Sequence, residues 1–147
     1  MNKNTGFTLI EVLIAMIILA VGLLGLAGLQ ATSLRNNQSA YDRSVATQLA
    51  YDIADRMRAN VAGKTTYTTI LPSAAAQKVS CLSVTGCSVA EMAENDFYEW
   101  YHAVASALPD GVGSITADGN VFTITISWTE NRGNPVTTRF QTGFQLL

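Results

Sequence analysis

The chain has 147 residues, of which 48% are hydrophobic, and its formal net charge is −2. This length is enough for one domain with a modest core. No run of lysine or arginine exceeds one residue, which argues against a nucleic-acid-binding surface built from bulk positive charge. The apolar residues are concentrated in the first thirty positions, so the composition predicts an apolar anchor joined to a small soluble domain.

The segment from Phe7 to Leu29 is apolar almost throughout and contains one ionisable residue, Glu11. Its length suffices for a helix that crosses a bilayer, which needs about 20 residues. Lys3 makes the short N-terminus basic, which favours a cytoplasmic start. A carboxylate well inside the bilayer costs about 2.5–3.5 kcal/mol on insertion scales, so the position of Glu11 indicates a function.

Two ordinary interpretations of this segment leave something unexplained. A cleaved secretory signal needs small residues at the −3 and −1 positions, and Leu29 would occupy −3 in the sequence Leu29-Gln30-Ala31. A plain signal anchor accounts for the length of the segment but has no use for Glu11.

The sequence GFTLIEV, residues 6–12, resembles the processing site of type IV pilins and of the related secretion pseudopilins. The resemblance implies that a prepilin peptidase cuts between Gly6 and Phe7 and methylates the new amino terminus of Phe7. The new ammonium group could neutralise Glu11 of the same or a neighbouring subunit. Such pairing would remove the free-energy cost of an unpaired carboxylate in lipid when subunits assemble. It would also fix the axial register of the packed helices. We therefore expect Glu11 to act in assembly and not in catalysis.

Helical periodicity continues beyond the apolar segment to about Asn60, and Gly63 is a candidate stop. Gly22, Gly25 and Gly28 lie three residues apart, a spacing that allows close helix approach or local flexibility in lipid. Charged residues, including Asp42, are expected on other faces of the helix than the apolar stripe. That stripe comprises Leu34, Tyr41, Val45, Leu49, Ile53 and Met57.

The sequences GLLGLAGLQ and SLRNNQSAYDRSVATQLAYDIADRMRAN, residues 22–60, are similar to minor pilins of the type IV pilus modification protein PilV family. The resemblance implies an α+β, type IV pilin-like fold. In this fold a long N-terminal helix packs on a small antiparallel sheet, with a second short helix. The implied organisation is a leader over 1–6, a transmembrane and assembly helix over 7–30, and a periplasmic head over 31–147. In the head, residues 31–60 continue the helix and 61–147 form the globular α+β part.

The same resemblance implies a minor pilin that helps to initiate type IV pilus assembly and enters the pilus near its tip. Its expected partners are the major pilin, other minor pilins, the prepilin peptidase, the inner-membrane assembly platform and a tip adhesin. No nucleic acid is expected among them. The protein would reside in the inner membrane before assembly and in the extracellular pilus afterwards. A minor pseudopilin of a type II secretion system is the alternative, and a membrane-anchored periplasmic binding module is a third.

Cys81 and Cys87 lie close together in the sequence CLSVTGC. In a reducing cytosol such a pair suggests a metal or redox site, whereas outside the inner membrane it suggests a disulfide. Zinc would need further ligands, and His102 is the single histidine of the chain. The periplasmic location therefore favours a structural Cys81–Cys87 disulfide. Glu99 lies near His102 in sequence, but no motif places a nucleophile beside them, so we expect no catalytic residue, metal or cofactor.

The head should contain a loop over 62–80, with a short strand at 65–71, and then a second helix. Ser88 and Glu91 predict a capping box at the start of this helix, with Pro109 and Gly111 at its end. Alternating residues predict strands at 113–117, 122–129 and 136–146, joined by turns at ADGN and ENRGNP. The apolar stripe of the second helix comprises Phe97, Trp100, Tyr101, Val104 and Leu108. One face of the second strand comprises Phe122, Ile124, Ile126 and Trp128, and one face of the third comprises Val136, Thr138, Phe140, Thr142, Phe144 and Leu146.

Overall fold

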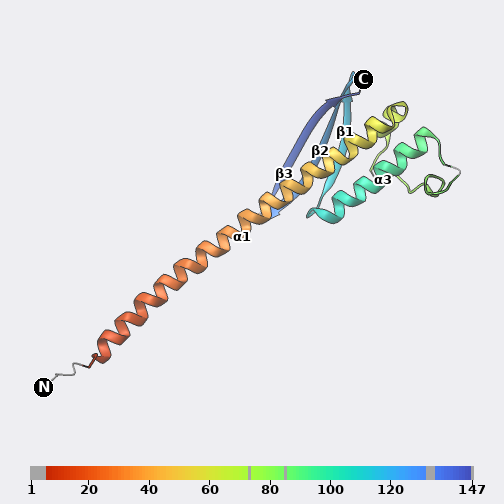
Figure 1. Cartoon of the computed structure of the whole chain (residues 1–147). Coiled ribbons are helices and arrows are strands. Elements are labelled where there is room, and N and C mark those ends of the chain that lie inside the picture. Colours follow the sequence, from red (N-terminus) through yellow and green to blue (C-terminus); the bar gives the residue numbers. More distant parts are fainter. Residues whose placement is uncertain (1–5, 73, 85, 132–134, 147) are drawn as a thin grey trace. The chain divides into compact units, whose positions relative to one another are not determined.

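The computed structural model describes residues 6–72, 74–84, 86–131 and 135–146 (Figure 1). The chain divides into two compact units, Met1–Gln38 and Ser39–Leu147, and helix α1 (Leu9–Ala59) contributes to both. The elements are therefore a long N-terminal helix, shorter helices and a three-stranded antiparallel sheet, which confirms the predicted α+β class. The second unit also contains η1 (Val61–Gly63), α2 (Lys64–Thr69), η2 (Val79–Leu82), α3 (Val89–Ala107), β1 (Val112–Asp118), β2 (Val121–Asn131) and β3 (Pro135–Gln145).

In the first unit α1 is a regular helix, and all the described residues of this unit, 6–38, are exposed. The helix continues through Gly22, Gly25 and Gly28 without interruption, and the Gly28 carbonyl accepts a hydrogen bond from the Thr32 hydroxyl at 3.1 Å. Among the described residues, α1 is the one helix that is long and apolar enough to cross a membrane, judged by length and composition. The predicted leader over 1–6 lies outside the described residues except for Gly6.

The sheet has the order β1-β2-β3, with both pairs antiparallel. A two-residue turn joins β1 to β2, because Asp118 pairs with Val121 and Gly119 takes a φ of 58°, which a glycine adopts without strain. This confirms the turn predicted at ADGN. The turn predicted at ENRGNP falls at 132–134, which lie outside the described residues, but the third strand that it was expected to introduce is present.

One face of β2 forms the centre of the core, as the alternation predicted: its four apolar side chains are buried. Trp100 of α3 packs over β1 and donates its indole N–H to the carbonyl of Leu49 on α1 at 2.8 Å. Ser88 and Glu91 form the predicted capping box at the start of α3. The predicted stripe on α3 is buried at Phe97, Trp100, Val104 and Leu108.

The face of α1 that the head covers agrees with the predicted stripe only in part. Ile53 and Met57 are buried as expected, and Val45 and Leu49 are half-buried against the core. Leu34 and Tyr41 are 69% and 62% exposed, whereas Asp42, expected on another face, is buried. The covered face is lined largely by small residues, which let the helix approach its neighbours closely, and Ser39 within it donates its hydroxyl to Glu130 of β2 at 3.2 Å. Large apolar residues therefore identified the C-terminal part of the packing face, at Ile53 and Met57, but not its start. Its buried members are Ser39, Asp42, Ala46, Ala50, Ile53, Ala54 and Met57.

The short strand predicted at 65–71 is wrong, because residues 64–69 form helix α2. Threonine favours strands, but here the hydroxyls of Thr68 and Thr69 donate hydrogen bonds to the carbonyl of Thr65 at 3.0 and 3.1 Å. Tyr67 is buried, and its hydroxyl donates to Asp96 of α3 at 2.6 Å. These local and tertiary contacts outweigh strand propensity.

The end of α1 agrees with the predicted position near Asn60 and comes before the candidate stop at Gly63. The helix ends at Ala59, and Asn60 then donates its side-chain amide to the Val89 carbonyl at 2.8 Å. Gly63 closes η1 with no room for a side chain, since a Cβ there would lie 2.7 Å from the Val89 carbonyl oxygen. The glycine is thus required for close packing against the start of α3.

A charged cluster joins α1, α2 and α3. The Arg56 guanidinium lies 3.2 Å from Asp52, 3.2 Å from Asp96 and 2.8 Å from Glu99. Burial acts to lower the pKa of Arg56, but its hydrogen bonds to Glu99 and Asp96 and the charge of Asp52 raise that pKa overall. Burial and the hydrogen bond to Asp96 raise the pKa of Tyr67. Arg56 stays charged and Tyr67 stays protonated throughout the neutral range.

We expect the cluster to make the head less stable in acid. The hydrogen bond from Arg56 holds the pKa of Glu99 below its ordinary value of 4.5. A group whose pKa is lower in the folded state adds stability above its unfolded pKa and loses it as the pH falls through the folded pKa. The contribution should therefore be complete at pH 7, decline below about pH 4.5, and not exceed about 1 kcal/mol because the pair is partly exposed. Thermal unfolding from pH 7 to pH 3 should show a shallower decline for Glu99→Gln than for the unaltered protein, and an equal decline would contradict this assignment.

Candidate processing and assembly site

The residues of the predicted processing site lie just before and within the first turn of α1. Gly6, Phe7 and Thr8 are outside the helix, which begins at Leu9. Phe7 is 84% exposed, and a Cβ built on Gly6 would meet no atom within 4 Å. The Gly6–Phe7 peptide bond therefore lies in accessible backbone outside the helix.

Thr8 caps the helix, a role that the sequence analysis did not assign. Its hydroxyl accepts a hydrogen bond from the Glu11 N–H at 3.3 Å, and its carbonyl accepts from the N–H groups of Glu11 and Val12 at 3.1 and 3.3 Å. The signal was present in the sequence, because threonine followed three residues later by glutamate is typical of a helix N-terminus. Thr8 thus fixes where the helix begins relative to Phe7.

Glu11 lies in the first turn of α1 on an exposed face that it shares with Phe7, Ala15 and Leu19. A carboxylate there is favoured by the positive end of the helix dipole. That interaction is modest beside the cost of burying a charge in lipid, so a cationic partner would still be needed in a membrane. In the uncleaved chain the nitrogen of Phe7 is a peptide amide, and cleavage would turn it into the ammonium group of the predicted pair.

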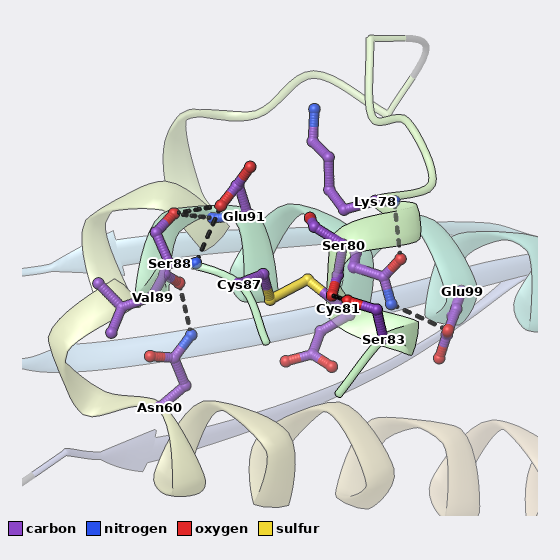
Figure 2. The surroundings of a disulfide bond; sticks show 12 residues. Asn60, Lys78, Ser80, Cys81, Ser83, Cys87, Ser88, Val89, Glu91 and Glu99 are labelled. Carbon is purple, nitrogen blue, oxygen red and sulfur yellow. Dashed lines mark hydrogen bonds between the residues drawn. A yellow bond between two sulfur atoms is a disulfide. The ribbon is translucent and has the colours of Figure 1, made fainter. Parts of the chain in front are cut away.

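Cys81 and Cys87 are joined by a disulfide with a Cα–Cα distance of 4.8 Å (Figure 2). The segments that flank the loop closed by this bond are held by hydrogen bonds. The Lys78 N–H donates to the Asn95 side chain at 2.9 Å, and Ser88, directly after Cys87, begins the capping box of α3. The bond therefore restrains the segment that enters α3.

We expect envelope-derived protein to contain the Cys81–Cys87 bond in full. A bond that closes so short a loop stabilises the fold by roughly 2 kcal/mol in the chain-entropy model. Non-reducing peptide mapping should recover the two cysteines in one linked peptide, and a Cys81→Ser, Cys87→Ser variant should have a lower unfolding temperature but an unchanged membrane anchor. Free thiols in protein taken from the envelope would contradict both the bond and the predicted periplasmic location.

The structure does not bring Glu99 and His102 together as an acid–base pair. The Glu99 carboxylate accepts hydrogen bonds from Arg56 at 2.8 Å and Asn95 at 2.9 Å. The His102 ring packs edge-on against Tyr98, with centroids 4.4 Å apart. Within the described ranges, no group of three or more histidine, cysteine, aspartate or glutamate side chains is placed to hold a metal ion.

Comparison with known families identifies two adjoining segments. Residues 1–27 match the prokaryotic N-terminal methylation motif, and residues 28–98 match the family described as type IV pilin Tt1218. No curated protein and no solved structure matches the chain. Over residues 1–98 the chain is thus similar to type IV pilins and to the N-methylation motif of prepilins.

The fold agrees with this class. A long N-terminal helix packed on a small antiparallel sheet is the type IV pilin fold, and the matched family is a structural pilin family, not an enzyme family. The methylation motif and the apolar N-terminal helix fit anchoring in the inner membrane followed by incorporation into a pilus.

Proposed function

We propose that this protein is a minor pilin of the PilV kind, which helps to initiate type IV pilus assembly and is incorporated near the pilus tip. The observation that carries the proposal is the direct succession of three features. These are the GFTLIE processing motif, an uncharged membrane-length helix from Val12 to Leu29, and a pilin head. A membrane-anchored binding module would need neither the motif nor Glu11.

In this proposal the head resides in the periplasm while α1 anchors it in the inner membrane. The prepilin peptidase removes residues 1–6 on the cytoplasmic side and methylates Phe7. Glu11 then pairs with the ammonium group of an adjacent subunit, which favours the pilus over the lipid because a lone carboxylate is unfavourable in hydrocarbon. Proposed partners are the major pilin, other minor pilins, the assembly platform and a tip adhesin.

A minor pseudopilin of type II secretion shares the motif and the fold, so the two functions need an experiment to separate them. Deletion of the gene should reduce surface pili and leave secretion of type II substrates unchanged, and a plasmid copy should restore the pili. Loss of secretion with normal pili would favour the pseudopilin. Normal pili together with normal secretion would contradict both.

A further inference from the structure

Strand β3 forms an edge of the sheet, and its outward-facing backbone groups can be identified. The Thr129 N–H donates to the Pro109 carbonyl at 2.8 Å, on the side of β2 that faces β1. The backbone N–H and C=O groups of successive residues point to opposite sides of a strand. Those of the odd-numbered residues of β2 therefore point toward β1, and those of the even-numbered residues point toward β3. Their partners in β3 are also even-numbered, as in the pair Phe122–Phe144. The outward N–H groups of β3 are therefore those of Thr137, Arg139, Gln141, Gly143 and Gln145.

This edge has few of the features that keep sheets from pairing with other chains. Natural edge strands are typically short, bulged, or rich in charge and proline. In contrast, β3 is 11 residues long and keeps an unbroken register with β2 from Gln145 to Pro135. Arg139 is its one charged residue, and Pro135 protects its first position alone. The C-terminal half of the edge is thus free of such protection.

Gly143 lies in that half, and the fold itself gives no reason for a glycine there. A Cβ at this position would lie no closer than 3.8 Å to any neighbouring atom, which is an ordinary contact, and its φ is not in the positive region. A glycine in a strand costs stability and typically marks the close approach of another backbone. Gly143 thus differs from Gly113 of β1, where a Cβ would collide with Trp100, and the missing side chain leaves room for another backbone at the edge.

We propose that the β3 edge accepts an edge strand from the head of a neighbouring pilin-type subunit. Phe140 and Phe144 of β3 are only half-buried on the core face of the sheet. An added strand with apolar residues at alternate positions would cover their exposed parts, while its backbone would pair with the outward groups of β3. The chemistry at the edge thus specifies an extended, alternating segment, not a helix or a charged surface.

The direction of the added strand follows from the direction of α1, and this step rests on the proposed function. Ser39 contacts Glu130, which is opposite Val136 near the start of β3, whereas Arg58 lies over the Phe144 ring, 4.9 Å from its centroid, near the end. Residues 39–59 of α1 therefore run in the same direction as β3. A neighbour anchored in the same membrane has its helix in this direction and would add an edge strand parallel to β3. Antiparallel pairing of β3 in two copies would reverse one of the helices.

The test is photo-crosslinking from β3 in piliated cells that express the full chain. A photoreactive amino acid at Gln141 should give a crosslinked product, and mass spectrometry should map the joined peptide to an edge strand of another pilin-type subunit. The same amino acid at Ser106, an exposed residue of α3, is the control and should not give that product. Gly143→Pro removes an outward donor and should lower the Gln141 product by about tenfold, whereas Gly143→Ala keeps the donor and should lower it less.

The outcomes separate this inference from the proposed function. If the protein is recovered in sheared pili but Gln141 gives no strand-mapped product, the edge inference is wrong and the proposed function stands. A product that maps to β3 of a second copy in antiparallel register, or to a helix, also overturns it. A strand-mapped product from a protein that is absent from pili supports the edge and contradicts the proposed function. The Gln141 measurement in the otherwise unaltered chain decides the matter even if Gly143→Pro fails to fold.

Discussion

Replacing Glu11 with leucine should leave the protein processed and inserted in the membrane but remove it from pili. The substitution makes the anchor more apolar, so insertion should be retained or improved. The Gly6–Phe7 bond is unchanged, so cleavage should persist. The variant lacks the Glu11 carboxylate. An unpaired carboxylate in lipid costs about 2.5–3.5 kcal/mol, and pairing in the pilus removes this cost, so the unaltered subunit favours the pilus. At equilibrium this difference corresponds to about a hundredfold change in the partition between pilus and membrane.

The measurement is the amount of this subunit in sheared pili relative to the membrane fraction. Glu11→Asp is the matched control, because it keeps the charge but shortens its reach, and it should give an intermediate ratio. Recovery of Glu11→Leu in pili at the normal ratio would mean that pairing is not the reason for Glu11. Recognition by the assembly platform or a role in methylation would then have to explain it.

Gly113→Val should be among the most destabilising single substitutions in the head. Gly113 is buried in β1 beneath the ring of Trp100, and a Cβ there would lie 2.7 Å from Cζ3 of that ring. Trp100 has little room to move, because its ring is buried and its N–H is bound to the Leu49 carbonyl. Overpacking of this kind costs about 2–3 kcal/mol. That loss should lower the unfolding temperature by roughly 10 °C.

Gly143→Val provides the matched control for this experiment, since it places the same residue in another strand of the same sheet. A Cβ at Gly143 makes only ordinary contacts, and valine favours strands, so stability should be unchanged or slightly higher. Thermal unfolding of the full-length proteins in detergent, followed by circular dichroism, compares the two. Equal unfolding temperatures for Gly113→Val and the unaltered protein would show that the Trp100 contact is not restrictive.

The elements with strong periodicity could be predicted from the sequence. Alternation in β2 identified its buried face, and the Ser88–Glu91 spacing located the start of α3, because both depend on local patterns. The threonine-rich segment of α2 was mispredicted because its conformation depends on Tyr67 reaching Asp96, a residue 29 positions away. Local propensity carries no information about such a contact.

The packing face of α1 shows a second limit. The prediction correctly included Ile53 and Met57, but it also selected the exposed Leu34 and Tyr41 and missed the buried Ala46 and Ala50. Where another element approaches closely, small residues mark the contact, and a hydrophobicity pattern gives them little weight. The processing motif was recognised by resemblance, whereas the cap at Thr8 could have been found from its spacing to Glu11 alone.

The most direct test of the account is the amino terminus of this protein in sheared pili. Mass spectrometry of the subunit recovered from the pilus fraction should show a chain that begins at Phe7 with an N-methyl group and contains an intact Glu11. This single result would establish cleavage at Gly6–Phe7, methylation and incorporation together. A chain in that fraction that retains Met1, or one that begins near Ala31 as after removal of a secretory signal, would contradict the account.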